Sequence, residues 1–346
     1  MKTNKSNLFL VILGFLILQH PIFAQNPSNE YRLMFYNVEN LFDTDDDSTT
    51  IDEEFLPKGD RFWTNKKFYL KLNRISQVIM AAGQGNLPTL IGLSEIENQK
   101  VLDLLIYKTP LGNLGYKIVH QESPDRRGID VALLYRKDLF TPIHYRTYSV
   151  KNPNDDQFKT RDILYLTGIT GADTLHLFVN HWPSKYGGVL ETKPLRALAA
   201  STLRIAIDSI LQSNKNSKVI IMGDFNDSPF DESMTKYLRA LEPMDSIQNQ
   251  EIYNLAYRKA KENKGSNKYQ GKWELIDQII VSGALLTAKH GLYTNLESFQ
   301  IFDAPFLLEE DKNYLGNKPF RTYLGFRYNN GFSDHLPVLL DLKSIN

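Results

Sequence analysis

The 346-residue sequence contains no cysteine, and this absence excludes several classes of protein at once. Such a chain forms no disulfide scaffold, no zinc finger and no iron–sulfur cluster, and it has no thiol nucleophile. An excess of one charge sign is also missing, because 40 Lys and Arg balance 40 Asp and Glu. The balance disfavours a cationic nucleic-acid coat protein, since sequence-independent affinity for DNA rests on clustered basic residues.

Long hydrophobic runs are scarce, and the one clear run lies near the N-terminus. Residues 8–18 (LFLVILGFLIL) are apolar, Lys2 and Lys5 precede them, and Ala24 follows. Eleven residues are too few to cross a bilayer, which needs about 20. We therefore predict a cleaved secretory signal peptide over residues 1–25, with an uncleaved anchor as the alternative. The mature chain, residues 26–346, is then expected to be secreted or periplasmic, without a stable membrane anchor.

Short β-branched or aromatic runs, bounded by turn residues, recur along the whole mature chain and predict strands. These runs are 31–36, 89–93, 129–135, 163–169, 174–179, 218–222, 275–281 and 337–342. Apolar residues at helical spacing predict helices around 68–82 and 199–210, and Asn98 suits the N-cap of a third. Strands at both ends of the chain, with no repeat or linker between them, predict a single α/β domain over residues 26–346.

Two polar stretches read as loops. Seven acids lie between Asp43 and Glu54, where a solvated loop is favoured over a calcium site because the EF-hand spacing is missing. Residues 263–271 (NKGSNKYQG) predict a flexible surface loop that touches substrate.

Polar side chains stand at the ends of many predicted strands. They are Asn37, Glu95, Asn180, His181, Asp224, Asn226, Asp277, Asp334 and His335. One such residue means little, because strand-end Asp and Asn are ordinary turn formers. Several sites of one chemistry predict a shared edge, since strands of one sheet can present their ends together.

The types of these residues indicate a chemistry. Carboxylate and amide oxygens without thiols suit Mg²⁺, with Mn²⁺ or Ca²⁺ as alternatives. Histidines beside acids suit proton transfer near neutral pH. A hard cation together with acid–base groups suits hydrolysis of phosphate esters. In GDFND, Asp224 and Asn226 are two apart in an extended segment and so face one site.

The ordered set of motifs resembles the endonuclease/exonuclease/phosphatase superfamily, of deoxyribonuclease-I-like fold, and in particular its secreted bacterial members. The motifs are YNVEN, LSEIEN, GDFND, LIDQII and SDHLP, and the likeness spans Tyr31 to Leu342. The resemblance implies a four-layer sandwich of two packed β-sheets flanked by helices. It also implies a divalent-metal phosphoesterase.

Residue roles follow from the resemblance alone. Glu95 would bind Mg²⁺ with help from Asn37 and Asp334. His335, oriented by Asp277, would act as general base or bind the scissile phosphate, and Asp224 would align or deprotonate the attacking water. Asn226 would hold a phosphate oxygen. His181 would be the second histidine, supported by Asp130, and Arg161 would contact phosphate.

Three functions compete at this point. The first is a secreted metal-dependent phosphodiesterase, a nuclease acting on nucleic acid as a monomer, with a basic edge drawn from Lys264, Lys268, Lys272, Lys185 and Lys193. The second keeps the fold but acts on sugar, inositol or lipid phosphates, for which an apolar loop at Phe302, Phe306 and Leu307 would be a membrane contact. The third is a non-catalytic binding protein, which the complete set of acids and histidines disfavours.

Overall fold

Two mixed β-sheets form the centre of the computed structural model, which describes residues 30–244 and 246–345. The predicted signal peptide lies outside the described residues. The strand order of the first sheet, sheet A, is β13-β19-β1-β2-β4-β3, and β14 also pairs with β19. The strands of sheet A are β1 (Glu30–Leu41), β2 (Leu90–Ile96), β3 (Tyr116–His120), β4 (Asp130–Arg136), β13 (Gly291–Tyr293), β14 (Phe299–Ile301) and β19 (Val338–Ile345).

The second sheet, sheet B, has the order β5-β6-β7-β8-β12-β9. Its strands are β5 (Thr141–Tyr148), β6 (Ile163–Thr170), β7 (Asp173–His181), β8 (Lys218–Asp224), β9 (Ile252–Asn254) and β12 (Asp277–Ser282). In each sheet one parallel pair, β1–β2 or β7–β8, sits among antiparallel neighbours. Three small hairpins lie outside the sheets: β10 (Asn267–Tyr269) with β11 (Lys272–Glu274), β15 (Leu308–Glu310) with β16 (Asn317–Pro319), and β17 (Tyr323–Leu324) with β18 (Arg327–Tyr328).

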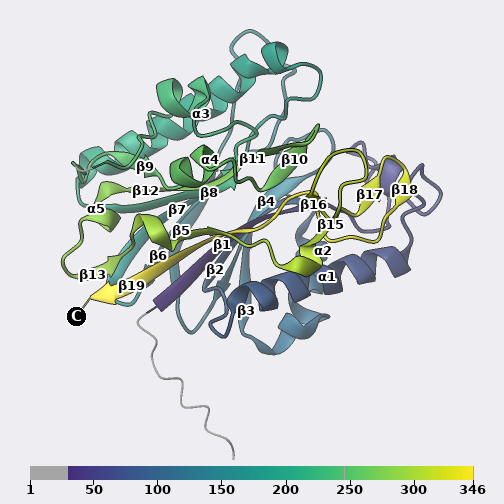
Figure 1. Cartoon of the computed structure of the whole chain (residues 1–346), viewed down its shortest axis with the longest axis horizontal. Coiled ribbons are helices and arrows are strands. Elements are labelled where there is room, and N and C mark those ends of the chain that lie inside the picture. The colour runs from purple at the N-terminus through teal and green to yellow at the C-terminus, as the bar shows by residue number, and fades with distance from the viewer. Residues whose placement is uncertain (1–29, 245, 346) are drawn as a thin grey trace, which may run out of the picture.

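Side-chain alternation along the strands builds three hydrophobic layers between four layers of structure. In β1, Leu33 and Phe35 belong to the core between the sheets, while Met34 and Tyr36 belong to the core under the helices. Helices α1 (Asn65–Gly83) and α2 (Gln99–Tyr107) cover the outer face of sheet A, and α3 (Val189–Ser213) covers that of sheet B. Figure 1 shows α3 and α1 on opposite sides of the two sheets. The predicted four-layer sandwich is confirmed.

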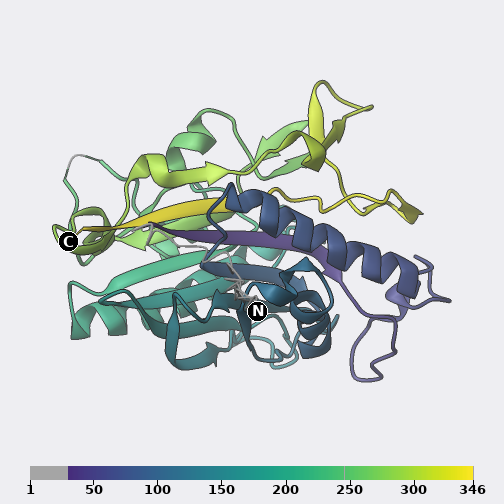
Figure 2. The same cartoon turned by 90° about the horizontal axis from the view of Figure 1, so that it is seen from below.

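The N- and C-terminal strands are neighbours, because β19 pairs antiparallel with β1 from Glu30–Lys343 to Phe35–Val338. Figure 2 shows these two strands side by side, with α1 running along them. The first residue of β1 and the last residues of β19 therefore lie at the same end of sheet A.

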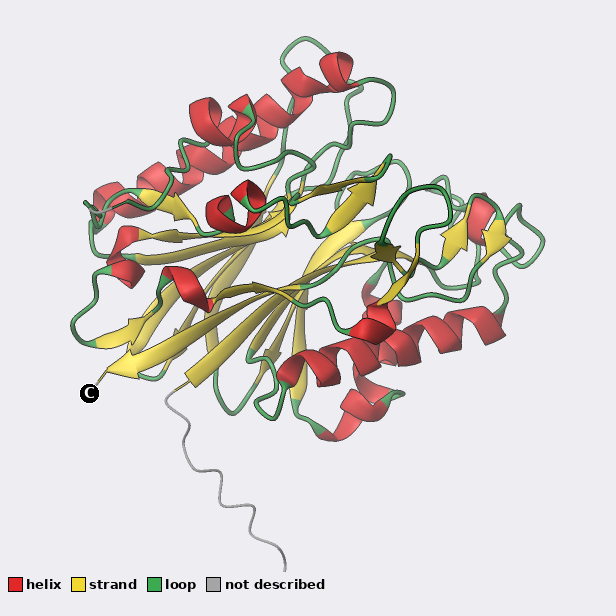
Figure 3. Cartoon of the chain, viewed as in Figure 1, coloured by secondary structure: helices red, strands yellow, loops and turns green. Residues whose placement is uncertain are grey.

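The helices follow the predicted periodicity, and Asn98 caps α2 by accepting a hydrogen bond from the Val101 backbone at 3.1 Å. Shorter helices are α4 (Tyr257–Lys261) and α5 (Gly283–Leu286), with 3₁₀ or π turns at η1 (Glu53–Phe55), η2 (Pro110–Asn113), η3 (Ser233–Tyr237), η4 (Leu296–Ser298) and η5 (Pro305–Leu307). Figure 3 shows that the long helices stay outside the strands. Among the described residues, no helix combines the length and hydrophobicity that a membrane crossing needs.

All eight predicted strands overlap observed ones, but the sequence pattern missed β3, β5, β9, β13, β14 and the three hairpins. Strand β5 is an edge strand with mostly exposed side chains, so it lacks the apolar alternation that marks a strand. The predicted loop at 263–271 was also wrong in part, because it contains β10 and the turn of the β10–β11 hairpin.

The acidic stretch 43–54 is not wholly solvated either. Asp43 and Asp52 are buried, and Asp43 forms a 2.9 Å ion pair with Lys100.

Candidate active site

The ends of six strands meet at one edge of the sandwich and carry the predicted side chains. In sheet B, Asp224 is paired with His181 on β7 and with Asp277 on β12. In sheet A, Asn37 lies opposite Ser94, next to Glu95. His335 comes just before β19, whose first residue pairs with Phe35 of β1. A 3.0 Å hydrogen bond from Asn37 Nδ2 to Asp224 Oδ2 joins the two sheets at this edge.

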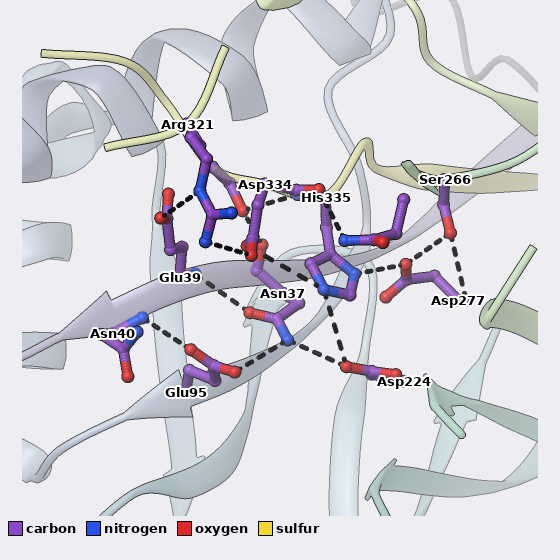
Figure 4. A network of polar contacts seen from close by, with 12 residues as sticks. Asn37, Glu39, Asn40, Glu95, Asp224, Ser266, Asp277, Arg321, Asp334 and His335 are labelled. Atoms are coloured by element: carbon purple, nitrogen blue, oxygen red, sulfur yellow. Dashed lines mark hydrogen bonds and ion pairs between the residues drawn. The ribbon is translucent and has the colours of Figure 1, made fainter. Parts of the chain in front are cut away.

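His335 and Asp277 form a buried pair, shown in Figure 4. Nδ1 of His335 lies 2.6 Å from Oδ2 of Asp277, which also accepts a hydrogen bond from Ser266 at 2.5 Å. Burial alone would lower the pKa of His335, but the carboxylates of Asp277 and Asp224 raise it well above its usual value. Asp277 therefore orients the imidazole and favours its protonated form.

The carboxylate oxygen Asp224 Oδ2 is the point where three side chains converge. Nε2 of His335 lies 3.9 Å from it and Nε2 of His181 lies 3.7 Å from it, in addition to the hydrogen bond from Asn37. Burial raises the pKa of Asp224 to about 7, against the opposing charge of His335. A carboxylate that titrates near neutrality is suited to accept a proton from water.

Glu95 adopts a backbone conformation that is unusual for a glutamate. Its φ is +62°, at an irregularity in the pairing of β2 with both neighbours. Its carboxylate accepts hydrogen bonds from Asn37 Nδ2 at 3.2 Å and from the Asn40 backbone at 2.8 Å. Glu39, Asn40 and Asn226 also have positive φ. Strained residues gathered in one place are characteristic of functional sites.

His181 is brought to the site, but its predicted support by Asp130 was wrong. The Asp130 carboxylate instead contacts His120 Nε2 at 3.1 Å and the Ser123 backbone at 2.9 Å. Within the described residues, Nδ1 of His181 is buried without a hydrogen-bond partner. Burial, followed by the charges of Arg161 and Arg127, lowers the pKa of His181 well below its usual value. The site thus pairs a neutral imidazole with a charged one.

Arg161 and Asn226 lie at the site, each already engaged with the backbone. Arg161 is buried and donates to the carbonyls of His181 and Trp182, and its guanidinium pairs with Asp125 at 3.0 Å. Asn226 donates its amide to the Trp182 carbonyl at 3.0 Å and its backbone N–H to Asp224 at 2.9 Å. Both hold the strand ends in place, and their contacts with phosphate stay predictions.

Asp334 is paired with an arginine that the sequence reasoning missed. Arg321 donates to Asp334 Oδ2 at 2.9 Å and to Glu39 Oε1 at 3.3 Å. Although burial opposes it, Arg321 and His335 lower the pKa of Asp334, so this side chain is a carboxylate. Glu39 lies inside the YNVEN motif and could have been noted there. Arg321 had no such signal, because nothing around it in the sequence marks a site.

The donor chemistry at this edge fits a hard divalent cation. Glu95, Asp334 and Asp224 offer carboxylate oxygens around Asn37, as Figure 4 shows, and hard oxygen donors are those that Mg²⁺, Mn²⁺ and Ca²⁺ prefer. The amide oxygen of Asn37 accepts from the Glu39 backbone at 3.0 Å, so its nitrogen faces the two acids. The assignment of Asn37, Glu95 and Asp334 as metal ligands stays a prediction.

One expected surface feature, the basic edge, is reduced, and another, the apolar loop, is not formed in the described part of the chain. Lys268 is nearly buried and pairs with Asp311 at 3.0 Å, while Lys185 pairs with Glu274 at 3.2 Å, so neither is an unpaired cation of a basic edge. Phe302 and Leu307 are buried in the core beside α1, and Phe306 packs against it. They do not form the exposed apolar loop expected of a membrane contact.

Comparison with known proteins agrees with this geometry. A family model described as Endonuclease/Exonuclease/phosphatase family matches residues 32–344. No curated protein matches the chain.

Several solved structures share its fold. TDP2 of D. rerio complexed with single strand DNA product is 15% identical, with a TM-score of 0.53, covering 91% of this chain and 99% of that one. The human Nocturnin catalytic domain with bound sulfate anion is 17% identical, with a TM-score of 0.51 and coverage of 92% and 96%. An endonuclease/exonuclease/phosphatase family protein from Bacteroides thetaiotaomicron is 14% identical, with a TM-score of 0.54 and coverage of 92% and 98%.

These identities support a shared fold, and the match of the family model over nearly the whole described chain goes further. The chain belongs to the endonuclease/exonuclease/phosphatase family.

Proposed function

We propose that this protein is a divalent-metal-dependent phosphodiesterase that hydrolyses nucleic acid. The observation that carries the proposal is the convergence of His335, His181 and Asn37 on one oxygen of Asp224. Two of the neighbouring folds support it: D. rerio TDP2 is complexed with a single strand DNA product, and the Nocturnin domain binds a sulfate anion.

The pKa shifts of Asp224, His335 and His181 indicate which role each side chain has in the reaction. Asp224, with its raised pKa, takes a proton from the attacking water. The charged His335, fixed by Asp277, donates a hydrogen bond to a phosphate oxygen as charge builds there. His181, neutral and 3.7 Å from the same carboxylate, orients the water or the leaving oxygen.

The metal is assigned to the carboxylates of Glu95 and Asp334, which Asn37 would join only through its amide oxygen, the atom that accepts from the Glu39 backbone. A divalent cation held there would supply Lewis-acid stabilisation of the negative phosphate oxygens. Arg321 keeps Asp334 in its carboxylate form for this task.

Activity against plasmid DNA and RNA in Mg²⁺ tests the proposal. We expect EDTA to abolish the activity of the purified protein and added Mg²⁺ or Mn²⁺ to restore that activity. Asp224→Asn should lower the rate by about two to four powers of ten, the usual size of an acid–base contribution. Asp138→Asn is the control and should act like wild type, because Asp138 lies at an exposed turn and pairs with Arg136, away from the site. Activity that resists EDTA, or a mild effect of Asp224→Asn, contradicts the proposal.

Export is part of the proposal and rests on Lys2, Lys5 and the apolar run 8–18. Mass spectrometry of the protein released from cells should find an N-terminus near residue 26. A full-length chain retained in the cell would contradict it.

A further inference from the structure

Arg321 stands at the active site with part of its hydrogen-bonding capacity unused. Its Nε and Nη2 are engaged with Glu39 and Asp334, but Nη1 makes no hydrogen bond within the described residues. The side chain is 41% exposed, whereas the neighbouring His335 side chain is 8% exposed. Asp334 connects the two residues, because its other oxygen lies 3.9 Å from His335 Nε2. A solvent-facing guanidinium this close to His335 is placed to meet the substrate phosphate.

Two pockets adjoin each other at Arg321, which is the residue that lines both. The first, called the Arg61 pocket, has a volume of about 270 Å³ and is also lined by Asn40, Arg61 and Tyr323. The second, called the tyrosine pocket, has a volume of about 290 Å³ and is also lined by Tyr269, Tyr314 and Asp334. A phosphate held at Arg321 would therefore have a cavity on each side of it.

The tyrosine pocket presents aromatic surface to solvent. Tyr269, the last residue of β10, is 63% exposed, and Tyr314, between β15 and β16, is 48% exposed. The close packing of Tyr314 depends on Gly271, where a Cβ would come within 2.7 Å of the Tyr314 ring. Exposed aromatic rings beside a phosphate site suit a flat ring that stacks, such as a nucleobase. The volume lies at the small end of ligand pockets and suits one base.

The Arg61 pocket has a different character. The guanidinium of Arg61 lies 5.0 Å from the ring centroids of both Phe55 and Tyr323, so it is held between two aromatic faces. Its Nη2 forms a 2.8 Å ion pair with Glu54 and its Nη1 donates to the Gly325 carbonyl at 3.0 Å, so this side chain is a fixed wall of the pocket. Glu39 and Asn40 also line this pocket. With Arg61 engaged, the polar lining that remains, Asn40, Thr322 and Arg321, suits a sugar–phosphate group and offers little to a base.

We propose that Arg321 binds the phosphate of a single-stranded nucleic acid, with one base in the tyrosine pocket and the adjoining sugar–phosphate in the Arg61 pocket. A base inside a duplex is stacked and paired, so it reaches such a pocket only after leaving the helix, which costs free energy that an unpaired base does not need. Single strands are thus the substrate class that this part of the site selects. The inference rests on the proposed function and adds to it a preference for single-stranded over double-stranded nucleic acid.

Binding measurements without turnover provide the main test. By calorimetry, Tyr314→Ala should weaken the affinity for thymidine 5′-monophosphate about tenfold, the scale of one stacking contact, and leave that for inorganic phosphate unchanged. Arg321→Gln should weaken both affinities. The control is Tyr145→Ala on edge strand β5, because Tyr145 is 49% exposed and lines neither pocket. Arg321→Lys, which keeps the charge near Asp334, should retain more affinity than Arg321→Gln.

Turnover supplies a second readout. Wild type should cleave a single-stranded oligonucleotide at least about tenfold more efficiently than the same sequence in a duplex, the scale of the unstacking cost. Tyr314→Ala should lose most of this preference, because the stacking contact that favours an unpaired base is then gone, whereas the control Tyr145→Ala should keep it.

Unchanged thymidine 5′-monophosphate binding by Tyr314→Ala overturns the inference, as do equal rates on single and double strands. Binding of inositol 1-phosphate as tight as that of the nucleotide overturns it as well, because no base is then recognised. If one of these contrary results appears and wild type nevertheless hydrolyses bis-p-nitrophenyl phosphate in Mg²⁺, only the inference about single strands fails. The proposed phosphodiesterase function is then retained. If wild type hydrolyses no phosphodiester, the proposed function itself fails.

Discussion

At the scale of single residues, the buried contact between His335 and Asp277 contributes both to the stability of the fold and to the proposed catalytic site. The Asp277 carboxylate is fully buried, and besides His335 its side-chain partner is Ser266. Its other oxygen, Oδ1, has no hydrogen-bond partner in the described part of the chain. A carboxylate in that position depends on the imidazolium for compensation of its charge.

His335→Ala is therefore expected to abolish activity and also to lower the free energy of unfolding by about 3–5 kcal/mol, because it leaves a buried charge unpaired. Denaturation in urea, with activity measured on the same samples, checks both effects. The double variant Asp277→Asn/His335→Ala removes the charge as well and should regain much of the lost stability while remaining inactive. A double variant less stable than His335→Ala would contradict this account.

At the scale of the elements, helix α1 does more than cover sheet A. Its Lys71 is 1% exposed and donates hydrogen bonds of 2.6 Å to Thr322 Oγ1 and to the Phe332 carbonyl. Those acceptors lie in the segment that carries Arg321 and leads to Asp334. One buried lysine thus ties the helix to the loop that completes the active site.

The protonation of Lys71 makes this tie sensitive to pH. Burial lowers the pKa of Lys71 to about 8, against the opposing charge of Glu39. The unfolded chain, with a lysine pKa of about 10.4, binds more protons between these values. Stability contributed through Lys71 is therefore full above the unfolded pKa and is lost as pH falls through 8.

We expect the difference in unfolding free energy between wild type and Lys71→Met to shift in favour of wild type from pH 7.5 to pH 10, by at most about 3 kcal/mol. Comparing urea denaturation of the two proteins at both pH values cancels the contribution of groups that they share. A difference that stays constant with pH would show that Lys71 does not titrate in this range.

At the scale of the whole molecule, the two sheets approach closely where β2 crosses β8. A Cβ added at Gly92 would lie 2.7 Å from Met222 Sδ and 3.1 Å from the Phe35 ring. Glycine at this position lets the inner faces of sheets A and B meet, which brings Asn37 within hydrogen-bonding distance of Asp224.

Gly92→Ala should accordingly destabilise the fold by about 1–3 kcal/mol through overpacking. The cost should shrink in a Met222→Ala background, because the added methyl group then has room, and a double-mutant cycle in urea measures this coupling. If the effects of the two substitutions on the unfolding free energy are additive, contact with Met222 is not the cause of the destabilisation by Gly92→Ala.

The sequence by itself determined most of the regular structure and the identity of the strand-end residues. Apolar periodicity depends on which side chains face a core, so it marked β1, β8 and α1 within a few residues. It missed β5, whose side chains are mostly exposed, because an edge strand needs no such pattern. The sharing of one site by Asp224, Asp277 and His335 followed from motifs that resemble a known family.

Only the tertiary structure decided which of these side chains touch. The pairing of β2 with β4 shifts between Ser94 and Ile96. Asp130 lies on sheet A beside His120, whereas His181 belongs to sheet B, so the predicted contact between Asp130 and His181 is not formed. Arg321 reaches Glu39 across 282 residues and carries no local motif. Local patterns record whether a side chain is buried, but a partner across two sheets is set by register and packing, which depend on the whole chain.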